Sequence, residues 1–115
     1  MIRKASEFKQ QIVPNMCGGD GNVYLGNAFK NSEIKSKVCA FCTVTLEKGG
    51  SVGMHQHTED DEIYYILSGK GEYSDNGAIT TVGPGDVTFC PPGEGHGILS
   101  IGDEPLELIA LILYE

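Results

Sequence analysis

Closely spaced glycine and proline residues are the feature that most constrains the fold of this 115-residue chain. The stretches between them are short and rich in β-branched and aromatic residues, which favour strands over helices. Several short strands with regular turn signals predict an all-β domain, either a sandwich or a barrel. The predicted strands cover residues 22–29, 38–46, 62–67, 71–74, 78–82, 87–90, 98–101 and 106–114.

Two segments carry more specific local predictions. Asp75-Asn76-Gly77 lies between two predicted strands. Because Asn-Gly accepts positive φ angles, this segment predicts a tight hairpin turn. Ala5 to Val13 is the only stretch that we interpret as a helix candidate, although it has no long apolar stripe.

The distribution of charge excludes two classes of partner. The net charge is −8, with a balance of +3 over residues 1–48 and −11 over residues 49–115. An acidic body without a basic cluster repels nucleic-acid phosphates and anionic lipids. We therefore expect no nucleic acid and no membrane among the partners. Arg3 is the only arginine, so the remainder of the chain lacks the two-pronged guanidinium that commonly binds carboxylates and phosphates.

The termini and the cysteines favour a cytoplasmic protein. Residues 1–5 lack the apolar segment of a signal peptide, and no apolar run approaches the roughly 18 residues that a membrane span needs. We interpret the four cysteines, Cys17, Cys39, Cys42 and Cys90, as free thiols. Cys39 and Cys42 have a C-x-x-C spacing, but on a predicted strand an offset of three residues directs the two sulfurs to opposite faces.

Candidate chemistry is concentrated in the three histidines of the chain, His55, His57 and His96. His55 and His57 are two residues apart, so on a strand both imidazoles lie on one face and could approach the same ion. The acidic turn that follows leads into the next predicted strand, which Glu62 opens. This turn could bring Glu62 back beside His57.

These residues fall into two motifs that resemble those of the cupin superfamily. The first is Gly49-x5-His55-x-His57-x4-Glu62-x6-Gly69, and the second is Gly85-x5-Pro91-x-Gly93-x2-His96. Fifteen residues separate the motifs, a short spacing similar to that of small single-domain cupins, including the oxalate-decarboxylase-like ones. One position departs from the pattern, because Ser100 stands where the second motif usually ends with asparagine.

The resemblance implies a fold and a ligand set. The fold would be the cupin double-stranded β-helix, a jelly-roll barrel over residues 36–115, with residues 1–35 as an N-terminal arm packed on the barrel or on a partner subunit. The implied metal ligands are His55, His57, Glu62 and His96. Ser100 is not at a ligand position, so its departure affects only a turn contact. An intact motif without a metal is the alternative.

Three imidazoles and one carboxylate suit one divalent transition metal, which could be Mn, Fe, Ni, Co, Cu or Zn, better than they suit Ca or Mg. In a six-coordinate site, four protein ligands leave two adjacent positions for a small molecule, whereas a tetrahedral zinc would be saturated.

The pocket of the barrel is expected to be small and partly apolar. If Glu62 points inward, strand parity directs Tyr64 and Ile66 the same way. Tyr64 could either pack in the core or donate a hydrogen bond to a ligand, which makes it the candidate catalytic residue. Glu59 and Glu94 are the other candidate acids or bases. Candidate wall residues are Phe41, Met54, and Phe89 or Cys90.

Two functions fit these features. The first is a metal-dependent enzyme with decarboxylase, dioxygenase, isomerase or lyase chemistry on a small oxygenated molecule. The second is a non-catalytic module that binds or senses a small ligand or a metal, since the fold hosts both classes. The missing arginine disfavours a dicarboxylate substrate. The charge division and the resemblance also predict a homodimer, in which the N-terminal segment crosses onto the partner.

Overall fold

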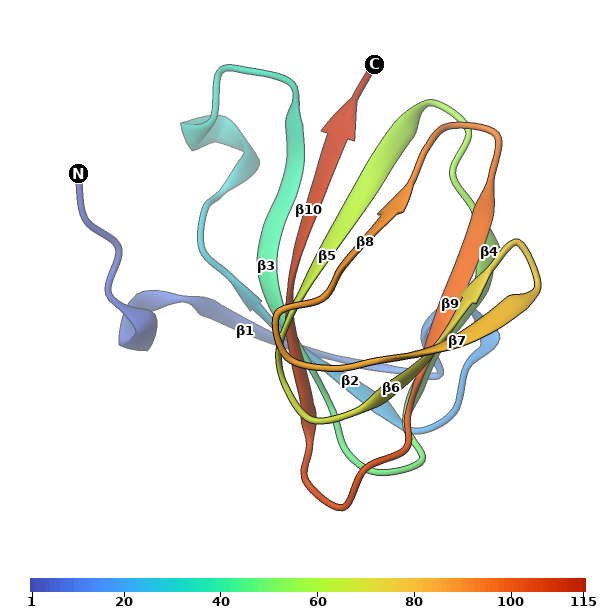
Figure 1. Ribbon diagram of the computed structural model, residues 1–115. Helices are drawn as coiled ribbons and strands as arrows, with labels where there is room; N and C mark the ends of the chain where they lie inside the picture. Colours follow the sequence, from blue (N-terminus) through green and yellow to red (C-terminus); the bar gives the residue numbers. More distant parts are fainter.

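Ten β-strands in two antiparallel sheets form most of the molecule, and the computed structural model describes residues 1–115. The six-stranded sheet has the order β1-β2-β3-β10-β5-β8, and the four-stranded sheet has the order β4-β9-β6-β7. The two sheets face each other (Figure 1), and the connections from β4 to β5 and from β8 to β9 join them at the upper end of that view. This arrangement confirms the predicted all-β jelly-roll barrel. No helix in the structure is long and apolar enough to cross a membrane.

The strands are β1 (Lys9–Pro14), β2 (Asn22–Asn27), β3 (Val38–Leu46), β4 (Ser51–Gln56), β5 (Asp60–Ser68), β6 (Gly71–Asp75), β7 (Ala78–Val82), β8 (Val87–Cys90), β9 (Gly95–Ser100) and β10 (Leu106–Tyr114). Three single turns of 3-10 helix accompany them, η1 (Ala5–Glu7), η2 (Met16–Gly18) and η3 (Asn31–Glu33). The bounds of β3, β7, β8 and β10 are those that the sequence predicts. The predicted turn between β6 and β7 is also confirmed, with φ angles of 53° at Asn76 and 96° at Gly77.

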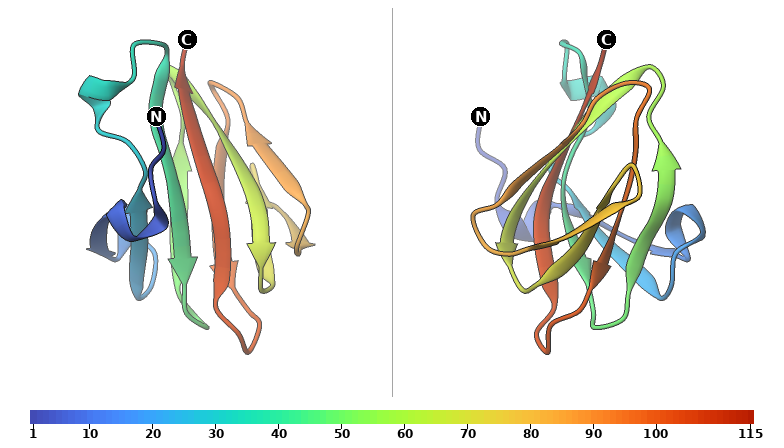
Figure 2. Two further views of the ribbon diagram at one scale, coloured as in Figure 1. Left: turned by 90° about the vertical axis from the view of Figure 1, so that its left-hand side faces the viewer. Right: turned by 45° about the vertical axis from the view of Figure 1, so that its right-hand side comes forward.

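The N-terminal segment corrects one prediction. Ala5 to Val13 is not a helix, because only Ala5–Glu7 form a 3-10 turn and the segment then continues into β1. The backbone of β1 pairs with β2 from Lys9↔Asn27 to Pro14↔Asn22. This ladder satisfies the polar backbone groups that a helix would satisfy internally. Together β1 and β2 extend the six-stranded sheet beyond β3 (Figure 2).

The hydrophobic core lies between the two sheets and contains thirteen buried residues. Leu46, Leu106, Leu108 and Ile66 are fully buried on the six-stranded sheet. They pack with the inward side chains of the facing sheet, among them Ile98. The core reaches the candidate site, since Tyr64, one of its members, stacks on the ring of His96.

A close contact between two glycines fixes the η2 loop against β4. A Cβ on Gly53 would lie 2.2 Å from the carbonyl oxygen of Cys17, and a Cβ on Gly19 would lie 2.8 Å from the amide nitrogen of Gly53. Only glycine permits backbones to approach this closely. The contact holds η2, with Met16 and Cys17, over the end of β4 that leads to the histidines.

Candidate metal centre

Three neighbouring strands and one turn bring the four predicted ligands together. His55 lies on β4 and pairs directly with His96 on β9. His57 follows the end of β4, and Glu62 enters from β5 in the opposite sheet. The turn at residues 91–94 supports His57, since the Gly93 amide donates to the His57 carbonyl at 2.6 Å and the His57 amide donates to the Glu94 carbonyl at 3.0 Å. Glu62 lies beside His57, as the sequence predicts, with its Oε1 3.1 Å from His57 Nε2.

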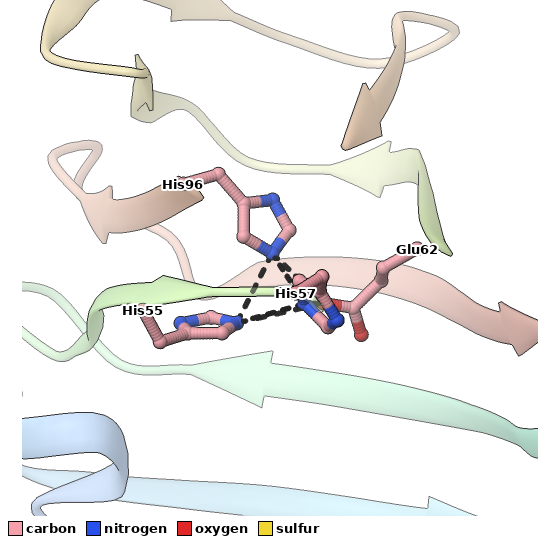
Figure 3. Close-up of side chains that lie close together, drawn as sticks. All are labelled: His55, His57, Glu62 and His96. Carbon is pink, nitrogen blue, oxygen red and sulfur yellow. Dashed lines mark hydrogen bonds and ion pairs between the residues drawn. The ribbon is translucent and has the colours of Figure 1, made fainter. Parts of the chain in front are cut away.

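The reactive atoms of these side chains point at one another (Figure 3). The Nε2 atoms are separated by 3.1 Å between His55 and His57, 3.1 Å between His55 and His96, and 3.2 Å between His57 and His96. Glu62 Oε1 lies 3.1 Å from Nε2 of His57, 2.9 Å from Nε2 of His96 and 3.8 Å from Nε2 of His55. The four residues thus form a cluster able to hold one metal ion.

The outer nitrogen of each imidazole has its own partner. His55 Nδ1 donates to the Gly53 carbonyl at 2.8 Å, and His57 Nδ1 lies 2.7 Å from Asp60 Oδ1. His96 Nδ1 lies 2.7 Å from the Tyr73 hydroxyl. A carbonyl and a carboxylate only accept, so they keep the hydrogen on Nδ1. The lone pair of Nε2 is then directed toward the centre of the cluster, as a metal ligand requires.

Electrostatics favour a positive charge in the cluster. Burial opposes ionisation of Glu62, but the hydrogen bond to His96 and the nearby imidazoles of His55 and His57 lower the pKa of this carboxyl to about 2. The carboxylate of Glu62 in turn raises the pKa of His55, while burial acts in the opposite direction. Glu62 is therefore an anion at neutral pH, and a cation beside it is stabilised.

A cavity of about 290 Å³ opens onto the cluster. His55, His57 and Glu62 form part of its lining, together with Tyr64. Ten of its fourteen lining residues are hydrophobic, so most of its wall is apolar. The full lining is Met16, Cys17, Leu25, Asn27, Ala40, Cys42, Val44, Val52, His55, His57, Glu62, Tyr64, Ala110 and Ile112.

Tyr64 is buried, with 3% of its surface exposed, and its ring stacks on that of His96 with centroids 5.0 Å apart. Ile66 also points inward, but it packs in the core and does not line the cavity. Burial raises the pKa of the Tyr64 hydroxyl, and the negative charge of Glu62 raises it further. Tyr64 therefore keeps its proton at neutral pH, so its hydroxyl is able to donate a hydrogen bond.

Several predicted wall residues lie elsewhere. Phe41 and Phe89 are 38% and 53% exposed, because they occupy the outward positions of β3 and β8. Met54 is 53% exposed, since an irregularity between Val52 and His55 shifts the register of β4. Cys90 is buried but does not line the cavity. The candidate acids Glu59 and Glu94 also lie outside the cavity. Glu59 is exposed, and the carboxylate of Glu94 accepts a hydrogen bond from the side-chain amide of Asn76.

The N-terminal segment supplies four lining residues that the sequence did not predict, Met16, Cys17, Leu25 and Asn27. Their place depends on the pairing of β2 with β3 and on the glycine contact that holds η2. Neither is a local pattern, so no sequence signal identified them. All four cysteines are free, in agreement with the prediction.

Comparison with known proteins places these observations in context. A family model described as a cupin domain matches residues 42–112. An oxalate-binding protein of Thermotoga maritima is 37% identical over 113 residues, which are 98% of this chain and 93% of that protein. Oxalate decarboxylase of Bacillus subtilis is 33% identical over 96 residues, which are 79% of this chain but only 24% of that enzyme.

Solved structures agree with this comparison. A predicted oxalate decarboxylase from Thermotoga maritima superimposes with a TM-score of 0.95 and 36% identity, covering 100% of both chains. The polyketide cyclase RemF of Streptomyces resistomycificus superimposes with a TM-score of 0.80 over 100% of this chain and 81% of that one. At 22% identity, this second likeness shows the fold alone.

Proposed function

This chain belongs to the cupin family, and from that premise we propose that it binds a small oxygenated molecule at a divalent transition metal held by His55, His57, Glu62 and His96. The observation that carries the proposal is the convergence of four ligand atoms within 4.8 Å of one another. The chemistry that we assign is of the decarboxylase, dioxygenase, isomerase or lyase type. A bound metal would supply Lewis acidity to an oxygen of the substrate.

The distances within the cluster support a six-coordinate ion. Five of the six separations between ligand atoms lie between 2.9 and 3.2 Å, and the sixth, between His55 and Glu62, is 3.8 Å. Adjacent ligands of an octahedral ion with bonds of about 2.1 Å are about 3 Å apart, and opposite ligands are about 4 Å apart. An ion of this kind, held by His55, His57, Glu62 and His96, would keep two adjacent positions for a small molecule. The donor set fits Mn, Fe, Co, Ni, Cu or Zn.

Side chains around the ligands have distinct roles in this proposal. Asp60, Tyr73 and the Gly53 carbonyl orient the three imidazoles. Tyr64 lines the cavity beside Glu62 and retains its proton. We assign its hydroxyl the role of donating a hydrogen bond to the bound molecule, which makes it the candidate catalytic residue.

Replacement of Asp60 by alanine tests the orienting contacts. The variant should bind metal about 10- to 100-fold more weakly, the usual cost of losing a partner of a metal-binding histidine. Asp60→Asn retains a hydrogen-bond acceptor, so its metal affinity should lie between those of Asp60→Ala and the wild type. Chelator competition with the purified protein measures both affinities. As a control, Glu59→Ala removes a neighbouring carboxylate and should leave the metal affinity unchanged. Equal losses of affinity in Asp60→Ala and Glu59→Ala would show that the effect comes from net charge and not from the contact with His57.

A non-catalytic ligand-binding module is the second candidate function. One observation favours it: apart from the cluster itself, Tyr64, the exposed thiol of Cys17 and the buried thiol of Cys42, no ionisable side chain lines the cavity. The Thermotoga relative carries the name of an oxalate-binding protein. Incubation of the metal-loaded protein with 2-oxo acids, diols and thiols distinguishes the two, because an enzyme consumes one of them and a binding module returns it unchanged.

We also propose that the chain forms a homodimer through the outward face of the six-stranded sheet. Two cross-strand rows on this face consist of apolar residues and one threonine, without any charge. We call these rows the outer apolar face: Phe41, Leu111, Ile63 and Phe89, then Thr43, Ile109, Tyr65 and Val87.

Exposure and charge favour a second copy as the partner on the outer apolar face. Tyr65, Val87 and Phe89 are 46%, 58% and 53% exposed, and Phe41 is 38% exposed. With aromatic side chains of roughly 200 Å² each, the three rings alone leave about 270 Å² of apolar surface in contact with water. A neutral patch on a chain of net charge −8 is the surface where two copies meet with least repulsion.

For the location of the protein we propose the cytoplasm. All four cysteines are free thiols. Reducing compartments maintain cysteines in this state, whereas oxidising ones favour disulfides.

A further inference from the structure

Small side chains on two central strands create the cavity beside the cluster. Ala40 on β3 and Ala110 on β10 both line it. Ala110 pairs with Tyr64, and Ile112, the partner of Ala40, pairs with Glu62. Farther along the same inward faces, Leu46, Leu106 and Leu108 are fully buried and fill the core. The cavity therefore lies where alanines replace the large residues found elsewhere on these strands.

The charges around the cavity limit what it can accept. Its lining contains one carboxylate, Glu62, and neither lysine nor arginine. The single arginine pairs with Glu33 and lies over the Phe29 ring, with Cζ 5.8 Å from its centroid, outside this cavity. If a divalent metal is bound, the site carries a net charge of about +1, which a single negative charge neutralises. A dianion would leave an unpaired negative charge against an apolar wall, and such burial is costly.

The size of the cavity points in the same direction. A volume of about 290 Å³ equals roughly ten water molecules at about 30 Å³ each. A dicarboxylate as small as oxalate, with about six non-hydrogen atoms, would leave a large part of this apolar space without contacts. A ligand with an apolar body of several carbons would fill it.

Resting on the proposed metal site, we propose that the ligand is a monoanion with a chelating head and a compact branched apolar body, the class represented by 4-methyl-2-oxopentanoate. Its carboxylate and oxo group form a two-oxygen head that matches two adjacent open positions. Its branched body packs against Ala40 and Ala110, which are the residues that set the permitted size. The proposal differs from the oxalate named for the Thermotoga relative.

Calorimetric titration of the full chain loaded with Mn²⁺ tests this proposal with three probes: 4-methyl-2-oxopentanoate, pyruvate and oxalate. The wild type should bind 4-methyl-2-oxopentanoate at least 10-fold more tightly than oxalate. Ala110→Leu should weaken the binding of 4-methyl-2-oxopentanoate at least 10-fold and leave that of pyruvate within about 3-fold, because a methyl group reaches less deeply than a branched chain. The matched control is Ala78→Leu, the same substitution at an exposed position of β7.

The remaining outcomes are also decisive. Tighter binding of oxalate, binding of none of the probes, or an Ala110→Leu variant with unchanged preference overturns the inference. Thermal melting reports whether Ala110→Leu folds, and the milder Ala40→Val replaces it if it does not. Elemental analysis of each sample separates the two proposals. One Mn²⁺ per chain with the wrong ligand preference refutes only this inference, whereas loss of Mn²⁺ from the wild type refutes the metal site and the inference together.

Discussion

His55→Ala protein should bind metal at least about 100-fold more weakly than the wild type, because the substitution removes one of four ligands and loses more than a change in a supporting residue does. His55 is suited to this test since it is only partly buried and does not belong to the hydrophobic core. The metal-free variant should therefore melt within a few degrees of the metal-free wild type. Elemental analysis after dialysis and chelator competition measure the loss.

A second ligand variant and a control variant complete this test. His96→Ala should lose metal to a similar degree, although it also removes a fully buried ring and the partner of Tyr73, so its melting temperature should fall further. Met54→Ala changes an exposed residue on the same strand as His55 and should retain full metal content. Full metal content in both histidine variants would refute the assignment of the ligands.

The double variant Tyr65→Lys/Phe89→Lys should be a monomer, with a mass near 12.3 kDa by light scattering, whereas the wild type should have twice that mass. Two lysines placed on the outer apolar face would have to lose their hydration in a dimer and would repel the same groups of the partner. Ile79→Lys alters a residue that is 60% exposed on the other sheet and should leave the dimer intact.

Two results would contradict this interface. A monomeric wild type would refute the dimer itself. A double variant that remains dimeric, but becomes monomeric when residues 1–20 are deleted, would assign the interface to the N-terminal arm that the charge distribution predicts.

The sequence predicts the strands and the cluster well where the signal is local. Runs such as residues 38–46 and 106–114 are bounded by turn residues, and their β-branched content leaves little ambiguity. The spacing of His55, His57 and Glu62 places their side chains together because a strand, a tight turn and a returning strand suffice to do so. The resemblance to cupins adds His96, which is distant in sequence and pairs with His55 only in the folded sheet.

The parts that the sequence does not predict depend on contacts between distant segments. In β1, five of six residues are exposed, so no alternation of apolar and polar residues marks it as a strand. In β3, both faces carry apolar residues. The large side chain of Phe41 points outward, while the smaller side chains of Ala40 and Cys42 line the cavity. Strand parity gives the two sets of residues, but only the position of the facing sheet decides which set is buried.

Anomalous X-ray diffraction from crystals of the metal-loaded protein tests the central proposal most directly, at the absorption edge of the metal found by elemental analysis. The predicted result is one strong peak per chain, at about 2.0–2.3 Å from Nε2 of His55, His57 and His96 and from a carboxylate oxygen of Glu62. No peak at this cluster, or a peak bound instead by the cysteines or by surface carboxylates, would contradict it.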